Sequence, residues 1–217
     1  MKKDKVSEAV IRRLPKYYRY LKELERIGIE RISSQELSKK MGIKATQIRQ
    51  DLNCFGGFGQ QGYGYHVKML KKEIKNIIGL NRTYNVVLVG AGNMGQALAN
   101  YAGFEKEGFH IKAIFDINPK LIGNKIRSKE ILDIDTLHEY AKKQDVDICI
   151  ITAPKESAQA IADTAIGVGI RSIWNFAPID VEAREGVCVE NVHLNDSLYT
   201  LVYRMNDSRE NEPSQEA

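Results

Sequence analysis

The sequence predicts an α/β protein with a small helical domain first and an open, doubly wound parallel sheet second. Up to about residue 80 apolar residues recur at helical spacing, whereas beyond residue 85 short apolar runs alternate with amphipathic segments. The charge changes at the same place: residues 1–80 hold 18 Lys and Arg against 8 Asp and Glu, and residues 81–217 hold 14 against 20. A basic first domain indicates a polyanionic partner, although a solvated basic surface would give the same charge.

Composition and cysteine usage narrow the class of protein. Of the 217 residues, 43% are hydrophobic and 28% are charged, which is typical of a globular protein with a buried core. No apolar run reaches the roughly 18 residues of a membrane span, and no apolar stretch follows the basic start as in a signal peptide. Cys54, Cys149 and Cys188 are odd in number and widely spaced, which predicts free thiols. We therefore expect a cytoplasmic protein with no membrane partner.

The first domain, residues 1–80, is expected to contain three helices, a hairpin and a linking helix. Apolar residues recur every three or four positions over about 16–27, 33–42 and 45–54. Ser33 and Glu36 stand in capping-box register, and Gly42 can end the second helix. Aromatic residues alternate with glycines over 55–65, which predicts a β-hairpin. The last helix, about 67–80, leads to the domain boundary.

The second domain, residues 81–193, is expected to be a Rossmann-type sheet. Strands are predicted at about 86–89, 111–115, 148–151, 172–174 and 187–189, with helices at about 93–102, 136–143 and 156–168. The third segment, residues 194–217, begins with a helix at about 196–205 that has Leu198, Leu201 and Val202 on one side. Residues 206–217 are polar, and we expect them to be disordered.

A glycine-rich sequence follows the first strand of the second domain and opens a helix. It reads Gly90, Ala91, Gly92, Asn93, Met94 and Gly95, which is the GxGxxG pattern of dinucleotide-binding loops. The first glycine permits a tight turn, the second lets the backbone approach a pyrophosphate, and the third lets helix and strand pack closely. Amide groups at the start of the helix face the phosphates.

An acidic residue ends the second strand of this domain. Asp116 lies 26 residues beyond Gly90, where a carboxylate can accept hydrogen bonds from the adenosine ribose. The negative charge would repel a 2′-phosphate, and the nearest following cation is Lys120. We therefore predict NADH and NAD+ as cofactors in preference to their phosphorylated forms. The alternative is that Asp116 is a solvated residue at a strand end.

Three helices followed by a glycine and aromatic hairpin indicate a winged helix-turn-helix, whose third helix enters the major groove of DNA. That helix carries Gln47, Arg49 and Gln50, which suit base edges and phosphates, together with Thr46. Each of these residues alone would be an ordinary solvated residue. Their clustering in a domain of net charge +10 predicts DNA binding.

In these motifs the chain resembles the Rex family of redox-sensing transcriptional repressors, over about residues 5–205. The matching pieces are Ser33-Ser34-Gln35-Glu36-Leu37, Gln47-Ile48-Arg49-Gln50-Asp51-Leu52, the hairpin from Phe55-Gly56 to Gly62-Tyr63-Gly64-Tyr65, the Gly90–Gly95 loop, Asn100-Tyr101-Ala102-Gly103-Phe104, and Asn175-Phe176-Ala177-Pro178.

The resemblance implies a homodimer on palindromic operator DNA, with an exchanged, domain-swapped C-terminal helix packed between the two domains of its partner. It implies that NADH closes the two Rossmann domains, so that the recognition helices no longer match successive major grooves. NAD+ would compete at the same site without releasing DNA as effectively. By position, Tyr101 would lie near the nicotinamide, with Ala153, Pro154, Ala177 and Pro178 around it. Tyr101 as a buried core aromatic is the alternative.

The chain departs from the family pattern at three places. The hairpin tip, usually basic, reads Gln60-Gln61, and the start of the recognition helix, often Ser or Thr, is Lys44. Lys44 lacks the side chain of a good N-cap but can add a phosphate contact. His193 stands where the family usually has Asp, which leaves open an ion pair between that position and Arg19.

Two other functions are compatible with a Rossmann-type sheet. An NAD-dependent dehydrogenase with an accessory basic domain would need an acid and a base, and His66, His110, His138 and His193 offer no convincing pair. A coenzyme A-sensing or other nucleotide-sensing regulator would keep the same sheet, but Asp116 favours a free ribose diol. We therefore predict a DNA-binding regulator and not an enzyme.

Overall fold

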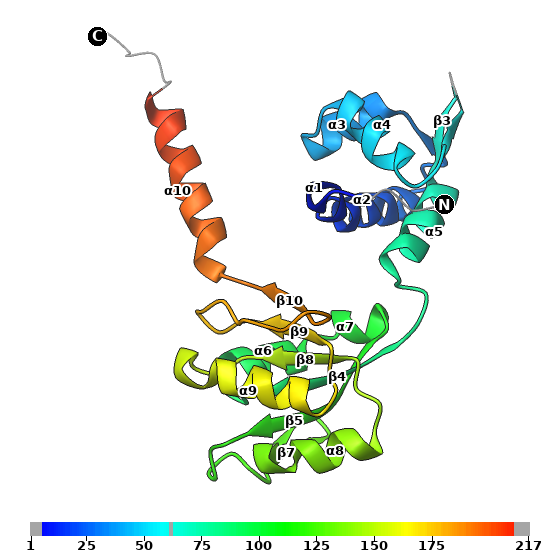
Figure 1. Cartoon of the computed structure of the whole chain (residues 1–217). Helices are drawn as coiled ribbons and strands as arrows, with labels where there is room; N and C mark the ends of the chain where they lie inside the picture. Colours follow the sequence, from blue (N-terminus) through cyan, green and yellow to red (C-terminus); the bar gives the residue numbers. More distant parts are fainter. Residues whose placement is uncertain (1–5, 61–62, 211–217) are drawn as a thin grey trace. The chain divides into compact units, whose positions relative to one another are not determined.

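The computed structural model describes residues 6–60 and 63–210 (Figure 1). The chain divides into two compact units, Met1–Arg82 and Thr83–Ala217. Within the described residues, no helix is long and apolar enough to cross a membrane. The cysteines are free thiols, as predicted, and Cys149 is buried in the sheet.

Over its described residues, the first unit contains five helices and a three-stranded antiparallel sheet of order β1-β3-β2. The predicted helices are present as α2 (Leu14–Arg26), α3 (Ser34–Met41), α4 (Ala45–Asn53) and α5 (Val67–Ile78), preceded by a short α1 (Glu8–Ile11). The predicted hairpin consists of β2 (Gly59–Gln60) and β3 (Gly64–His66), and β1 (Arg31–Ile32) pairs with β3. The core is formed by residues of α2 to α5 and the sheet, among them Tyr17, Leu21, Leu37, Ile48, Leu52, Tyr65 and Ile74.

The caps of α3 and α4 differ as the sequence predicts. The hydroxyl of Ser33 accepts a hydrogen bond from the Glu36 amide at 3.1 Å, and the Glu36 carboxylate accepts one from the Ser33 amide at 2.8 Å. This is a complete capping box, and Gly42 ends α3 in the left-handed region at φ 67°. Lys44 makes no side-chain cap for α4.

The second unit is built on a seven-stranded sheet of order β10-β9-β8-β4-β5-β7-β6. The five predicted strands are β4 (Tyr84–Val89), β5 (Phe109–Asp116), β8 (Ile148–Ile151), β9 (Ser172–Asn175) and β10 (Cys188–Asn191), all parallel. The prediction missed β7 (Lys129–Asp133), which is parallel to β5, and β6 (Lys125–Ile126), an antiparallel edge strand. The sheet is therefore mixed and not wholly parallel.

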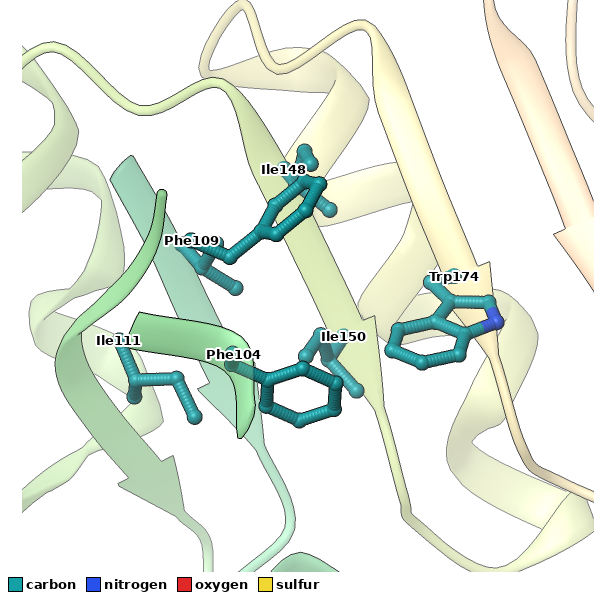
Figure 2. A pocket seen from close by; sticks show the side chains of 7 residues that line it. Phe104, Phe109, Ile111, Ile148, Ile150 and Trp174 are labelled. Carbon is teal, nitrogen blue, oxygen red and sulfur yellow. The ribbon is translucent and has the colours of Figure 1, made fainter. Parts of the chain in front are cut away.

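Helices cover the two faces of this sheet unequally. One face, with Val87, Val89 and Phe115, packs against α8 (Leu137–Lys143) and α9 (Lys155–Gly167). The other face packs against α6 (Asn93–Asn100) and the one-turn α7 (Gly103–Lys106). No helix occurs between β9 and β10, where residues 176–187 are all described. The second face carries an apolar cavity of about 290 Å³, in which Phe104 and Trp174 approach one another (Figure 2).

The C-terminal helix α10 spans Leu194–Glu210. It is longer than predicted, because residues 206–210, expected to be disordered, continue the helix. Residues 211–217 lie outside the described part of the chain. Every large apolar side chain that α10 carries over residues 194–205 is exposed: Leu194, Leu198, Tyr199, Leu201, Val202, Tyr203 and Met205.

Candidate functional site

The turn after β4 leaves no room for side chains at its first and third glycines. Gly90 has φ 106°, and a Cβ atom there would lie 2.8 Å from the Thr152 carbonyl. A Cβ atom on Gly95 would lie 1.8 Å from the carbonyl oxygen of Gly90. Both positions require glycine, because backbone from β8 and from the turn itself fills the space.

The middle glycine, Gly92, differs from the other two because its surroundings are open. Gly92 caps α6, and nothing lies within 4 Å of a Cβ atom built on it. The amide groups of the first turn of α6 follow directly, and a helix N-terminus attracts anions. Backbone can therefore be approached closely at Gly92, as the binding of a pyrophosphate requires.

Asp116 connects this turn to the end of β5. Its two carboxylate oxygens accept hydrogen bonds from the amides of Ala91, at 2.6 Å, and Asn118, at 2.7 Å. The residue is only 9% exposed, so the view of Asp116 as a solvated strand end is wrong. Each carboxylate oxygen can accept a further hydrogen bond, because one amide leaves a lone pair free.

A cavity of about 430 Å³ lies at the carboxyl ends of β4, β5 and β8. Of the residues predicted from the sequence, it brings together Gly90, Gly92, Asp116, Ala153 and Pro154. Ligands of open α/β sheets bind at this edge. The prediction missed further lining residues, namely Val89, Ile117, Asn118, Leu121, Thr152, Ser157 and Ile161.

Thr152 could have been found from its position directly after β8. Its hydroxyl donates to the carbonyl of Gly90 at 2.7 Å and so fixes the turn from the neighbouring strand. Ala91, Asn93, Met94 and Gly95 contribute backbone and packing to the loop and do not line the cavity.

The remaining predicted cofactor residues lie outside the lining of this cavity. Tyr101, 59% exposed, ends α6 and stacks edge-to-face on Phe104 at 4.9 Å, so the alternative of a buried core aromatic is wrong. Gly103 is crowded by this ring, because a Cβ atom there would lie 2.4 Å from it. Ala177 is buried and Pro178 is exposed in the turn after β9.

A buried asparagine shapes that turn. The amide nitrogen of the Asn175 side chain donates to the Ile179 carbonyl at 2.7 Å and to the Asn191 side chain at 2.9 Å. Its oxygen accepts from the Ala177 amide at 3.0 Å. These bonds fix the Asn-Phe-Ala-Pro segment at the same edge of the sheet as the glycine turn, because β9 is parallel to β8.

In the first unit, a buried carboxylate anchors the recognition helix α4. Asp51 is fully buried and accepts hydrogen bonds from Arg13 at 2.5 and 2.9 Å and from the Tyr17 hydroxyl at 2.7 Å. Gln47 donates to the same carboxylate at 2.8 Å. Burial opposes ionisation of Asp51, but these hydrogen bonds outweigh it and hold its pKa below the ordinary value.

This anchor divides the predicted DNA-binding residues into two groups. Thr46, Arg49 and Gln50 are exposed on α4, and Lys44 is exposed just before it. The side-chain amide of Gln47, by contrast, donates a hydrogen bond to Asp51. Arg49 donates to the Ser34 hydroxyl at 2.9 Å. Gln60 ends β2, and Gln61 lies outside the described residues. Within residues 6–60 and 63–210, no group of His, Cys, Asp or Glu side chains could hold a metal ion.

Two models of protein families match the chain. One, described as "Putative DNA-binding protein N-terminus", matches residues 5–53, and the other, described as "CoA binding domain", matches residues 81–179. These ranges fall on the unit with the recognition helix and on the unit with the glycine turn.

Relatives that match nearly the whole chain are named Redox-sensing transcriptional repressor Rex. The chain is 57% identical to that of Thermoanaerobacter pseudethanolicus, over 95% of this chain and 92% of the relative. It is 58% identical to that of Clostridium tetani, over 96% and 99%, and 60% identical to that of Clostridium botulinum, over 94% and 98%.

Solved structures agree with these relatives. A crystal structure of RSP in complex with NAD+ and operator DNA has a TM-score of 0.89 and 55% identity, covering 95% of each chain. RSP, described as a Rex-family repressor, has also been solved in complex with NADH, with a TM-score of 0.88, 52% identity and coverage of 95% and 97%. The chain therefore belongs to the Rex family of redox-sensing transcriptional repressors.

Proposed function

We propose that this protein is a cytoplasmic transcriptional repressor that binds operator DNA as a homodimer and is released from it by NADH. The observation that carries the proposal is that one chain joins a basic winged-helix unit to a second unit with a cavity at the glycine turn, whose lining suits a dinucleotide. Relatives at 52 to 55% identity form complexes with NADH, and with NAD+ and operator DNA. The close relatives are named as repressors and not as enzymes, which disfavours the dehydrogenase alternative.

The cavity fits a dinucleotide in two respects. The open backbone at Gly92 and the start of α6 suit the pyrophosphate, and Asp116 suits the hydroxyls of the adenosine ribose. A carboxylate at this position disfavours a 2′-phosphate, so NADH and NAD+ are preferred to NADPH. Tyr101, with the turns at Ala153–Pro154 and Ala177–Pro178, surrounds the nicotinamide in this proposal.

The winged-helix unit supplies the DNA contacts. In the proposal α4 enters the major groove, where Arg49 and Gln50 contact bases or phosphates and Lys44 and Thr46 contact the backbone. Gln47 acts mainly through Asp51, which fixes the helix.

The apolar surface of α10 supports a dimer. Seven large apolar side chains are exposed on this helix, and isolated exposed residues would not form such a continuous set. The sheet face that packs against α6 and α7 carries an apolar cavity that an apolar helix could fill (Figure 2). In the proposal, each protomer exchanges α10 and packs it against its partner, and two recognition helices then read a palindromic operator.

Fluorescence anisotropy tests the function, with the operator duplex of the solved relative as the probe and ionic strength held constant. NADH is expected to release the duplex at concentrations where NAD+ does not. Release of the duplex by coenzyme A but not by NADH would instead favour the coenzyme A alternative. The second family model, described as "CoA binding domain", is the reason for including this ligand. Sustained oxidation of NADH with a small carbonyl compound would favour the dehydrogenase.

Deletion of residues 194–217 tests the exchanged helix. The truncated chain is expected to lose dimerisation, measured by analytical ultracentrifugation, and to lose NADH-triggered release while its winged helix stays folded. A truncated protein that remained dimeric and released DNA at the same NADH concentration would contradict the exchange and leave NADH sensing intact.

A further inference from the structure

The hairpin of the winged-helix unit carries no cation of its own. Residues 55–66 read Phe-Gly-Gly-Phe-Gly-Gln-Gln-Gly-Tyr-Gly-Tyr-His, with neither Lys nor Arg. A wing that approaches DNA gains affinity mainly by neutralising phosphates, so a cation near it must come from another segment.

Strand β1 lies tightly against this hairpin. Arg31 is opposite His66 and Ile32 is opposite Tyr65 in an antiparallel pair, and the Val67 amide donates to the Glu30 carbonyl at 2.9 Å. Gly64 has φ 70°, and a Cβ atom there would lie 2.6 Å from the Ile32 carbonyl oxygen. The position of β1 against the wing is therefore fixed by backbone contacts.

Arg31 extends from β1 over the wing. Its guanidinium lies 5.9 Å from the centre of the Tyr63 ring, and its Nη1 donates to the Tyr63 carbonyl at 3.4 Å. Tyr63 is 71% exposed, and Arg31 is exposed as well. An arginine over an aromatic face keeps its charge and loses side-chain freedom, so it is oriented before any ligand binds.

The charge of Arg31 is not neutralised by protein. Arg12, Arg13 and Arg26 are paired with Glu8, Asp51 and Glu23, respectively. Among the residues the structure describes, no carboxylate lies within ion-pair distance of Arg31. Its guanidinium therefore retains donors that suit a phosphate.

The recognition helix meets the same segment of chain. Arg49 of α4 is hydrogen-bonded to Ser34, three residues beyond Arg31. This hydrogen bond places α4 next to the segment of chain that carries Arg31.

We propose that Arg31, oriented by Tyr63, is the contact between the wing and the DNA phosphates, in place of a cation within the hairpin. The inference rests on the proposed function, because it assigns a role on operator DNA. A phosphate contact adds affinity without sequence information.

Anisotropy titrations of Arg31→Ala over a range of salt concentrations test this inference. The probes are the operator duplex of the solved relative and a scrambled duplex of the same length and base composition. Affinity for both duplexes is expected to fall by roughly tenfold, and the slope of log K against log salt to fall by about 0.9. Tyr63→Phe keeps the ring and should bind as wild type, whereas Tyr63→Leu should lose part of the affinity.

Arg26→Ala is the matched control, because it removes one exposed positive charge whose guanidinium already pairs with Glu23. The control is expected to retain the wild-type salt slope, and NADH titration should show that every variant is folded. The inference would be overturned if Arg26→Ala and Arg31→Ala had equal effects, or if Arg31→Ala bound DNA as wild type does. Neither result would affect the proposed function, provided that the wild-type chain binds operator and is released by NADH. A loss on operator alone would also overturn it, since it would make Arg31 a base contact. A wild-type chain that binds neither duplex would overturn both proposals.

Discussion

The recognition helix and the glycine turn are positioned by different means. On α4, the carboxylate of Asp51 receives hydrogen bonds from three side chains, one of them charged, inside a core that otherwise consists of apolar and aromatic residues. At the end of β4, the Gly90–Gly95 turn is shaped by missing side chains, by backbone contacts with Thr152 and by amide bonds to Asp116. One site is therefore sensitive to the loss of a charge, and the other to the addition of a methyl group.

The difference fits what the two sites must bind. A helix that reads a groove needs exposed side chains on a rigidly oriented backbone, so its anchor lies on the inner face. A pyrophosphate needs open backbone, so the turn excludes side chains at the contact and fixes its geometry from behind.

The largest effect is expected from Asp51→Ala. Removal of the carboxylate leaves the Arg13 guanidinium and the Tyr17 hydroxyl without their partner, and breaking such a pair costs about 3–5 kcal/mol, with the lower end expected because Arg13 is partly exposed. Chemical denaturation should show this loss in the first unit, while NADH binding by the second unit persists. A loss below about 1 kcal/mol would contradict the role of Asp51 as the anchor of α4.

Alanine substitutions at two glycines separate folding from binding. Gly95→Ala is expected to destabilise the second unit by about 1–3 kcal/mol, because its Cβ would overlap the Gly90 carbonyl. Gly92→Ala should change stability by no more than about 0.5 kcal/mol, because its methyl group meets no other atom of the protein. It should still weaken NADH binding, because the methyl group would occupy the space through which the pyrophosphate approaches the backbone. Thermal unfolding and NADH titration of both variants measure the difference. Unchanged NADH affinity in Gly92→Ala would place the pyrophosphate elsewhere.

Arg49→Ala tests the outer face of α4. Operator affinity is expected to fall by about 1–3 kcal/mol if the side chain reads a base, with NADH affinity unchanged. Equal losses on operator and scrambled DNA would make Arg49 a phosphate contact. Wild-type affinity for both would remove it from the interface.

Asp116→Ala tests the acidic end of β5. The substitution removes a ribose acceptor and a charge that repels a 2′-phosphate, so NADH should bind more weakly and the preference over NADPH should narrow. Asp116→Asn is the matched control that keeps an acceptor for the Ala91 amide. An unchanged preference in isothermal titrations of Asp116→Ala would show that this carboxylate does not face the ribose.

The smallest effect is expected at His193, just before α10. Its ring lies 2.8 Å from the Asp180 carboxylate, and this hydrogen bond raises the pKa of His193 above 6.5 against a weaker effect of burial. The charged pair of His193 and Asp180 therefore stabilises the protein fully below pH 6.5, and this stabilisation is lost as the pH rises through the raised pKa of His193. The stability difference between wild type and His193→Asn should shrink as the pH rises above 6.5. A difference independent of pH would exclude the charged pair.

The sequence predicted most of the fold because apolar periodicity and glycine positions are local signals. It missed β1, β6 and β7, since strands of two to five residues show little periodicity and β1 exists only through pairing with β3. It placed Gly90, Gly92 and Asp116 in one site, but the bond between Gln47 and Asp51 depends on the approach of α2 and could not be read from spacing. The contact of Arg31 with Tyr63 depends in the same way on the pairing of β1 with β3 and has no signal in the spacing of residues.

The most direct test of the account is the reciprocity of the two ligands. NADH can release DNA only if it binds the DNA-free form more tightly, so operator DNA must weaken NADH binding by the factor by which NADH weakens operator binding. Titration of NADH into the protein with and without saturating operator duplex measures this factor at constant salt. We expect a coupling of about 1–3 kcal/mol, equal in both directions. Equal NADH affinity with and without operator would contradict it.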